Sequence, residues 1–448
     1  MLNSLKIPSC RFLVIFFSTL LVSNFFSPFL ADLHAEPITD EQMEASYKKT
    51  VLVLSSRGGY GHTAAANTLQ KLIGDRYELK VVHPIDQLRI WGVPSGEQFY
   101  NMMLKRGWIR SMNFLARHLA PRLFRSRRHK IEKIIDSYIQ AYQPNLVVSL
   151  IPYINYPASE AARKEEIPYL LITTDNDLRN WSFGLEKLKH PNFRVTIGSD
   201  LPTTRGILRK KNIPESAIET IGLPLRPDFI TTKNEEQIRE EYRIPYEKPV
   251  ILVMMGGAGS KSSYEYARKI GGMDLATHLI ICTGRNEKLK KDIEKIKLHP
   301  TNSMTVLGFT EKVADLMAMS DLLITKPGPG TINEAIAMQI PILVDNVDAS
   351  LFWERANSEM VVNFGIGEKI KDYKQMRKVL KAFLSDREKR KEIENSFANL
   401  PSNKFHERIG EIVDSMLASS PEKIAAPAHP SGHQQAEAML PVNCPAVD

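Results

Sequence analysis

The residues best suited to chemistry lie in one strand–turn–helix segment, Asp321 to Ala335. Gly328 and Gly330 would let the backbone approach a ligand without a Cβ clash. The N–H groups at the start of a helix from Thr331 are unpaired donors at the positive end of its dipole, an arrangement that binds a diphosphate. Glu334, one turn further on, could accept hydrogen bonds from both hydroxyls of a ribose. The alternative interpretation is that the glycines only shape a tight turn and that Glu334 is a solvated helix residue.

Two more Gly-rich turns favour the ligand interpretation. Gly256-Gly257-Ala258-Gly259 follows one apolar run and Thr283-Gly284-Arg285-Asn286 follows the next. Turns at the carboxyl ends of parallel strands meet at one edge of a sheet. The chain contains neither the Gly-x-Gly-x-x-Gly dinucleotide fingerprint nor a P-loop, which disfavours a hydride-transfer enzyme and a P-loop ATPase.

Two side chains that can exchange a proton follow strands in the first half of the chain. His62 ends the Gly-rich turn that begins at Gly58 and contains Gly59 and Gly61. A helix start tends to keep imidazole neutral, as a general base requires. Asp175 follows another strand and is predicted either as the base or as the orienting partner of His62. The alternative for His62 is an ordinary residue at a helix start.

The elements that position these residues form two series of buried strands alternating with helices, which predicts an α/β fold with two Rossmann-like doubly wound domains facing across a cleft. We expect a first domain over residues 48–225, a linker over 226–248, a second domain over 249–400 and a C-terminal helix over 401–420. The apolar runs predicted as strands are Thr50–Ser55, Leu146–Leu150, Tyr169–Thr173, Arg194–Ile197, Val250–Met254, Leu279–Cys282, Met304–Val306, Leu322–Thr325 and Ile342–Val344.

Composition excludes several other classes of protein. The 448 residues are 43% hydrophobic and 25% charged, too apolar for a disordered chain and too polar for a protein with many membrane spans. Cysteine occurs only at Cys10, Cys282 and Cys444, a spacing that excludes a disulfide scaffold and a cysteine-based zinc site. We predict no metal site and no cofactor.

The two ends of the chain have compositions of their own. Residues 1–36 combine Lys6 and Arg11 with an apolar run, which indicates either a secretory signal peptide or a membrane anchor. Residues 421–448 hold five prolines and no hydrophobic period, and are predicted to be a disordered tail.

The excess of positive charge is concentrated between Lys105 and Lys130. This stretch holds nine Lys or Arg residues, among them Arg125, Arg127 and Arg128, and no acidic residue. Bulky apolar residues are interleaved with the cations: Trp108, Met112, Phe114, Leu115, Leu119, Leu123 and Phe124. Such an amphipathic basic segment is typical of an anionic membrane interface. A solvated basic face is the alternative, and nucleic acid is disfavoured because no nucleic-acid-binding module accompanies the segment.

Three motifs together resemble one enzyme family. Residues Val306 to Ala335, Gly58 to His62, and Gly222 to Phe229 with its Gly-x-Pro-x-Arg pattern are similar to the GT-B glycosyltransferases that make monogalactosyl or glucosyl diacylglycerol. These are distant relatives of the peptidoglycan N-acetylglucosaminyl transferase. The resemblance covers roughly residues 50 to 400.

The resemblance implies a UDP-sugar as donor. The backbone around Phe309 and Thr310 would hold the uracil, Gly328, Gly330 and Thr331 the diphosphate, and Glu334 the ribose. Further expected donor-binding residues are Gly256, Gly257, Arg285, Lys326, Glu354 and Asn357. The chain departs from the family where relatives carry a Gln-Glu or Gln-Gln pair for the sugar hydroxyls, because it has Trp353-Glu354 there. The identity of the sugar therefore stays open.

The resulting expectation is a membrane-associated, inverting glycosyltransferase that moves a hexose to diacylglycerol or a similar lipid. Its expected partners are a UDP-sugar, a lipid acceptor met by Gly59, Gly61 and Trp108, and an anionic membrane surface, with no nucleic acid. The expected location is the cytoplasmic face of the inner membrane, while the signal-like segment leaves export open. The alternatives are an N-acetylglucosaminyl transferase acting on a polyprenyl-linked acceptor, a UDP-N-acetylglucosamine 2-epimerase, and a catalytically degenerate nucleotide-sugar-binding protein.

Overall fold

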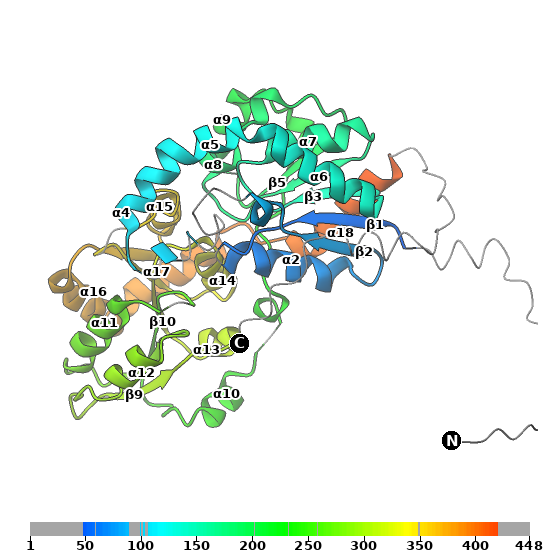
Figure 1. The fold of residues 1–448 in the computed structure, drawn as a ribbon. Helices are drawn as coiled ribbons and strands as arrows, with labels where there is room; N and C mark the ends of the chain where they lie inside the picture. Colours follow the sequence, from blue (N-terminus) through cyan, green and yellow to red (C-terminus); the bar gives the residue numbers. More distant parts are fainter. Residues whose placement is uncertain are drawn as a thin grey trace, which may run out of the picture. The chain divides into compact units, whose positions relative to one another are not determined.

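Two six-stranded sheets, each entirely parallel, organise the described part of the protein (Figure 1). The computed structural model describes residues 48–419, except Gly59, 89–98, 100–101, 104–105, Leu201, Thr232, Ala258 and 348–349. The expected signal or anchor, the C-terminal tail, Gly59 and Lys105 lie outside the described residues.

The first sheet has the strand order β2-β1-β3-β4-β5-β6. Its strands are β1 (Thr50–Leu54), β2 (Glu78–Val82), β3 (Leu146–Ser149), β4 (Tyr169–Ile172), β5 (Phe193–Ile197) and β6 (Ile218–Thr220). Chain order reverses between β1 and β3, so the loops after these two strands diverge and leave room for a ligand between them. The helices of this domain are α2 (Tyr60–Ile73), α4 (Ile109–Phe114), the π-helix η2 (Leu115–Leu119), α5 (Ala120–Ser126), α6 (Arg128–Tyr142), α7 (Asn155–Lys164), α8 (Leu178–Trp181) and α9 (Pro202–Lys210).

The second sheet has the order β12-β11-β10-β7-β8-β9 and reverses between β7 and β10. Its strands are β7 (Val250–Met254), β8 (His278–Cys282), β9 (Ser303–Leu307), β10 (Leu322–Thr325), β11 (Ile342–Asp345) and β12 (Gly367–Ile370). The accompanying helices are α10 (Glu235–Glu241), α11 (Lys261–Gly271), α12 (Glu287–Ile293), α13 (Val313–Ala318), α14 (Pro329–Ala337), α15 (Arg355–Asn363), α16 (Tyr373–Ser385) and α17 (Arg387–Ala398). The two doubly wound domains expected from the sequence are confirmed.

The chain returns to the first domain at its C-terminal end. Short 3-10 helices lie at Pro84–Gln87, Leu185–Lys187, Glu215–Ala217 and Pro227–Phe229, and the last helix is α18 (Phe405–Ala418). Phe405 and Ile409 on α18 are buried in one cluster with Val51 on β1 and Leu69 on α2. In Figure 1, α18 accordingly lies beside the strands of the first sheet, although it follows the second domain in the chain.

Side-chain caps fix where several helices begin. The Ser260 side chain accepts a hydrogen bond from the N–H of Ser262, Asn286 from that of Leu289, and Asp372 from those of Lys374 and Gln375. Each cap satisfies a donor that has no acceptor within the helix. Two of the capped helices, α11 and α12, begin directly after the Gly-rich turns of the second sheet, so the caps also set where those turns end.

Among the described residues, no helix has both the length and the apolar character needed to cross a membrane.

Candidate functional site

The Gly-rich turns of the second sheet interlock at its carboxyl edge. The N–H of Arg285 donates to the carbonyl of Gly257 over 3.0 Å. Gly284 has φ +60°, and a Cβ there would lie 2.3 Å from the Gly257 oxygen, so only glycine fits. The turns after β7 and β8 therefore support each other, and the turn after β10 lies across the point where strand order reverses.

The turn after β10 leads into α14, which begins at Pro329 rather than at Thr331 as expected. Proline has no N–H and suits the first helical position. The N–H groups of Gly330 and Thr331 thus belong to the first turn, where no intrahelical acceptor exists. A Cβ on Gly330 would meet no atom within 4 Å, so the space beside this turn is open. These features match a site for a phosphate-bearing ligand.

Lys326 and Glu354 lie together beside this turn. The Lys326 Nζ is 3.5 Å from the Glu354 Oε1, and the Lys326 Cε would lie 3.0 Å from a Cβ on Gly256. Glu354 is buried, whereas Lys326 keeps 40% of its side chain exposed. A Cβ on Gly328 would stand 3.9 Å from the Glu354 Oε1. Four of the predicted donor-binding residues therefore come together at one place.

Glu334 is buried and faces the interdomain segment. Its Oε1 accepts a hydrogen bond from the Nε of Arg226 over 2.9 Å, and the Nη2 of the same guanidinium lies 2.9 Å away in an ion pair. Burial raises the pKa of the Glu334 carboxyl, and the charge of Arg226 opposes that increase. Arg226 belongs to the Gly222-to-Phe229 motif, so this ion pair joins two segments that the sequence had singled out separately.

Arg285 and Phe309 form an exposed pair at the ends of β8 and β9. The Arg285 guanidinium lies 4.6 Å from the centre of the Phe309 ring, and Phe309 is 44% exposed. The Thr310 hydroxyl accepts a hydrogen bond from the N–H of Lys312. An exposed aromatic ring beside an arginine is a surface on which a nucleotide base can stack.

His62 lies in the first turn of α2, where the first sheet reverses strand order. Its Nδ1 is 3.4 Å from the Thr174 hydroxyl, and its ring is 6.0 Å from that of Trp181. Part of the residue stays accessible, yet burial of the imidazole lowers its pKa to about 4, against which a hydrogen bond with the Leu150 backbone acts. His62 is therefore neutral at pH 7. The neutral form was expected from the helix start, but its main cause is desolvation.

Asp175 is directed toward the second domain. Its Oδ1 accepts hydrogen bonds from the N–H of Asp177 and from the Asn357 amide, both at 3.2 Å. Burial raises the pKa of Asp175 to about 8, and the two hydrogen bonds oppose this rise. In the unliganded protein Asp175 is thus mostly protonated at neutral pH. The hydrogen bonds of the His62 ring are with the Thr174 hydroxyl and the Leu150 backbone.

Asn357 connects the two candidate regions. Its Nδ2 donates to Asp175 and, over 3.2 Å, to the carbonyl of Pro327, and its Oδ1 accepts from Asn176. The residue is fully buried, so both of its donors are used within the protein. Asn357 therefore ties the loop after β4 to the turn after β10, a role that differs from direct contact with a sugar.

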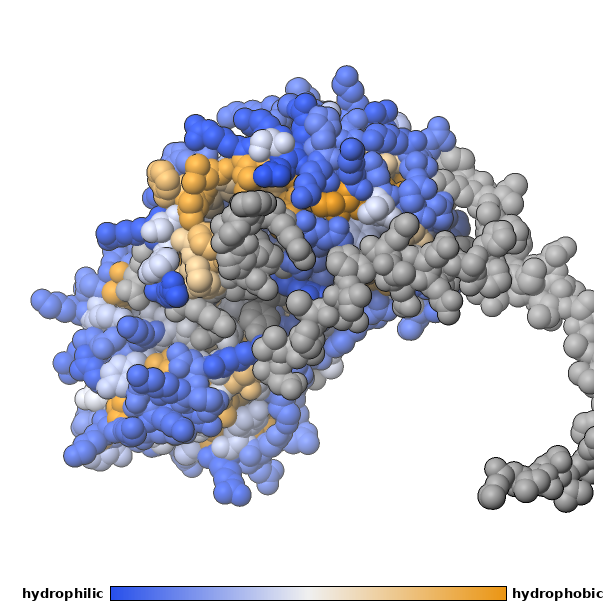
Figure 2. Space-filling model, viewed as in Figure 1, coloured by the Kyte–Doolittle hydropathy of each residue, from blue (hydrophilic) through white to orange (hydrophobic). Residues whose placement is uncertain are grey.

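The basic segment forms α4, η2, α5 and the start of α6. Trp108, Phe114, Leu119 and Leu123 are exposed, with fractions from 36% to 58%, and Figure 2 shows a hydrophobic band over these helices. Met112 is buried, and Phe124 packs against the first core, so these two apolar residues do not face outward. Gly61 has open space around it.

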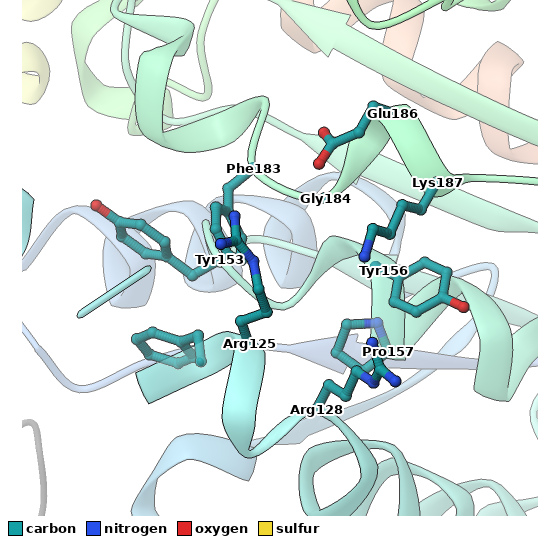
Figure 3. A pocket seen from close by; sticks show the side chains of 10 residues that line it. Arg125, Arg128, Tyr153, Tyr156, Pro157, Phe183, Gly184, Glu186 and Lys187 are labelled. Atoms are coloured by element: carbon teal, nitrogen blue, oxygen red, sulfur yellow. The ribbon is translucent and has the colours of Figure 1, made fainter. Parts of the chain in front are cut away.

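A pocket lies at the end of this band (Figure 3). Arg125, Arg128 and Lys187 surround it, and Tyr153 and Phe183 contribute aromatic walls. The Arg125 guanidinium lies 5.6 Å from the centre of the Phe183 ring, and Arg127 is exposed at the N-cap of α6. Two of the three predicted membrane-contacting arginines therefore flank an aromatic depression, away from the turns of the second sheet.

The residues described contain no group of three or more His, Cys, Asp or Glu side chains arranged to hold a metal ion.

Comparison with known proteins identifies the second half of the chain. Residues 250–410 match the glycosyltransferase family 28 C-terminal domain. These residues are therefore similar to a domain found in glycosyltransferases. The chain is 27% identical over 364 residues to the chloroplastic monogalactosyldiacylglycerol synthase of Spinacia oleracea, a match that covers 75% of this chain and 66% of that protein. It is 24% identical over 342 residues to the processive diacylglycerol beta-glucosyltransferase of Bacillus licheniformis, covering 70% and 83%.

The expected resemblance to diacylglycerol glycosyltransferases is confirmed by these matches. The chain spans 66% of the length of the Spinacia oleracea relative and 68% of that of an Arabidopsis thaliana relative. Its fold is similar to that of Acinetobacter baumannii MurG, with a TM-score of 0.55, 15% identity and coverage of 82% and 100%. A putative UDP-N-acetylglucosamine 2-epimerase from Listeria monocytogenes gives a TM-score of 0.53 at 14% identity, with coverage of 85% and 100%. Both likenesses establish the GT-B fold alone.

Two residues at the candidate site, Thr174 and Asn176, carried no signal in the sequence, and the partner of a third, Arg226, was not predicted. Thr174 contacts His62, Asn176 contacts Asn357, and Arg226 pairs with Glu334. The motif around Arg226 was recognised, but the partner of its guanidinium was not.

Proposed function

We propose that this protein is a glycosyltransferase that moves a hexose from a UDP-sugar to diacylglycerol or a similar lipid alcohol at a membrane surface, with inversion at the anomeric carbon. The observation that carries the proposal is the hydrogen-bonded path from one sheet to the other. It runs from His62 through Thr174 to the adjacent Asp175, and from Asp175 through Asn357 to Pro327 beside the open turn of α14. A proton acceptor and a phosphate-binding turn are thus held by loops in contact with each other.

The proposed reaction is a single displacement. The acceptor hydroxyl gives its proton to the neutral imidazole of His62, and its oxygen forms a bond to the anomeric carbon. The bond between that carbon and the diphosphate oxygen breaks, and UDP leaves with the electron pair. Attack on the face opposite the leaving group inverts the anomeric configuration.

The leaving diphosphate would gain negative charge beside the N–H groups of Gly330 and Thr331 and the ammonium of Lys326. A helix N-terminus and a fixed cation stabilise such charge without reorganisation during the reaction. Lys326 also lies beside Glu354, which we assign to a hydroxyl of the hexose because it is buried at the rim of the same turn. Glu334 would bind the ribose hydroxyls, which requires them to share or replace its contact with Arg226.

His62 is the better candidate for the base. Its lowered pKa keeps it unprotonated at pH 7, whereas the raised pKa of Asp175 keeps that carboxyl mostly protonated in the unliganded protein. We assign Asp175 a positioning role, because its hydrogen bond to Asn357 holds the loop that carries Thr174 against the donor turn.

The lipid acceptor would reach His62 from the surface formed by α4, η2 and α5. The exposed side chains of Phe114, Leu119 and Leu123 supply apolar contact with the membrane, and the surrounding arginines attract anionic head groups. The names of the relatives support diacylglycerol as the acceptor and leave galactose and glucose open as the hexose.

The test is transfer by the purified protein from labelled UDP-galactose, UDP-glucose or UDP-N-acetylglucosamine to diacylglycerol in anionic vesicles. We expect a glycolipid with one of the first two donors, and loss of product in His62→Ala and Glu334→Ala. His129→Ala is the matched control, because its side chain is 75% exposed on α6. Transfer only to a polyprenyl-linked acceptor, release of a water-soluble epimerised sugar, or UDP binding without turnover would each contradict the proposal and favour one of the alternatives.

A further inference from the structure

A loop of the second domain packs against the lipid-facing helices of the first. Leu351 is buried in a cluster with Met103 and with Met112 on α4, and Trp353 packs against the same cluster. Figure 1 shows α4 beside α15, the helix that follows this loop. The residue that departs from the family pattern, Trp353, thus takes part in an interdomain contact.

The side chain of Asn113 holds the backbone of this loop with both ends of its amide. Its Oδ1 accepts from the N–H of Phe352 over 2.9 Å, and its Nδ2 donates to the carbonyl of Ser350 over 3.0 Å. The carbonyl of Phe352 also accepts from Arg179, and the Phe352 ring lies 4.6 Å from the Arg117 guanidinium. A planar amide that satisfies two backbone groups fixes both the position and the direction of the loop.

The loop ends at the donor site. The N–H of Glu354 donates to the carbonyl of Leu351 over 3.0 Å, which closes a turn onto the residue packed against α4. Beyond that turn, the Glu354 carboxylate lies 3.5 Å from the Lys326 Nζ. Displacement of residues 350–352 would therefore displace Glu354 from the place where we assign it to the hexose.

The same helical segment also carries exposed apolar residues. Phe114 is next to Asn113 in the chain and 58% exposed, and Leu119 is 47% exposed. Between α4 and α5 the chain forms a π-helical turn ahead of Pro121, which lacks an N–H and whose ring would clash with the carbonyl four residues before it. Residues 109–126 are helical throughout, and Asn113, near the C-terminal end of α4, contacts the loop.

We propose that Asn113 is a positioning residue for the hexose site and that it transmits the occupancy of the lipid surface to Glu354. The proposal rests on the proposed function. Insertion of Phe114 into lipid restricts α4, Asn113 then restricts residues 350–352, and Glu354 is held ready for the sugar. The affinity for a UDP-hexose is accordingly several-fold higher on a membrane than in solution. The affinity for UDP alone is the same in both.

The experiment compares the affinities of UDP, UDP-galactose and UDP-glucose with and without phosphatidylglycerol–phosphatidylcholine vesicles that lack diacylglycerol, so that no transfer occurs. In the wild type, vesicles should tighten binding of at least one UDP-hexose and leave UDP unaffected. Asn113→Ala should abolish this vesicle effect while retaining UDP affinity and vesicle binding. Asn113→Asp, which keeps an acceptor for the Phe352 N–H and loses the donor to Ser350, should keep part of the effect.

Asn395→Ala is the control, since Asn395 is exposed on α17. A purely structural role would weaken binding of UDP and of UDP-hexoses alike, and that result would overturn the inference. So would an undiminished vesicle effect in Asn113→Ala, or UDP binding with no vesicle effect in the wild type. Absence of UDP binding to the folded wild type would overturn the proposed function, and this inference with it.

Discussion

The two domains use similar sheets but build their sites from different parts of the chain. At the carboxyl edge of the second sheet the chemistry is in the backbone, where interlocked turns around Gly257 and Gly284 support free N–H groups at Gly330 and Thr331. At the edge of the first sheet it is in buried side chains, chiefly His62 and Asp175, whose pKa values are shifted in opposite senses from their ordinary ranges. The function of the second domain should therefore be sensitive to Gly→Ala substitutions, which add a Cβ atom. The function of the first should be sensitive to replacement of its titratable side chains.

The largest effect should be on the transfer rate, after substitution of His62 in the first domain. His62→Ala should reduce transfer by about 100-fold or more, because a positioned general base contributes on the order of 10²–10⁴ in rate. UDP affinity should stay unchanged, since His62 belongs to the other domain. Initial rates of glycolipid formation and calorimetric titration with UDP check both statements. Activity of His62→Ala close to that of His129→Ala would remove His62 from the mechanism.

Loss of positive charge should weaken membrane binding when it occurs on the lipid-facing surface of the first domain, and not when it occurs on the second domain. Replacing Arg125, Arg127 and Arg128 with Gln should weaken binding to anionic vesicles by about 100-fold, at about 1 kcal/mol for each cation near the surface. The same loss of three charges at Lys288, Lys291 and Lys297 of the second domain, all exposed, should have little effect. Vesicle flotation at several salt concentrations measures the difference, and equal weakening by both triple variants would contradict a membrane surface confined to the first domain.

In the second domain, where the site is formed by the backbone, substitution of two glycines should have different effects: one on UDP binding and the other on thermal stability. Gly330→Ala should weaken UDP binding by about tenfold, or about 1.4 kcal/mol, without lowering the melting temperature, because its Cβ meets only the open space where the ligand would lie. Gly284→Ala should lower the melting temperature, because it combines φ +60° with a contact of 2.3 Å to the Gly257 oxygen. Thermal melts with and without UDP distinguish the two. A stable Gly330→Ala protein with unchanged UDP affinity would rule out the α14 turn as the diphosphate site.

The last prediction concerns stability and its dependence on pH. Because the pKa of Asp175 rises from 3.8 to about 8 on folding, the native state binds more protons than the unfolded state between these values. This carboxyl therefore favours folding less as the pH rises from 4 to 8. The free energy of unfolding of Asp175→Asn, minus that of the wild type, should increase over this range on the order of 1 kcal/mol per pH unit. Urea unfolding at a series of pH values gives the slope, and a difference independent of pH would show that Asp175 is ionised in the native protein.

Most of the strands predicted from the sequence have both faces covered; the exception is β9, an edge strand of partly buried residues that was predicted at Met304–Val306. Every residue of β1 is buried, as in β8 and β10, so their apolar runs stand out from the flanking residues. The structure adds β2, β6 and β12, which the sequence did not indicate. These are edge strands, and their polar residues, such as Glu78, Glu219 and Lys369, hide the pattern.

The site residues likewise divide into those in local motifs, which the sequence reveals, and those in long-range contacts, which it does not. The Gly-rich turns could be recognised because their residues are consecutive. The contacts of Glu334 with Arg226 and of Asn113 with Ser350 join residues 108 and 237 positions apart, and nothing local marks either pair. The raised pKa of Asp175 likewise depends on burial among residues of both domains, which no local pattern reveals.

The most direct test of the account is calorimetric titration of the folded protein with UDP, followed by the same titration of Gly330→Ala and Glu334→Ala. We predict one UDP bound per chain, with weaker binding in each variant. Failure of the folded wild-type protein to bind UDP would contradict the assignment of the α14 turn as the donor site and, with it, the proposed transfer reaction.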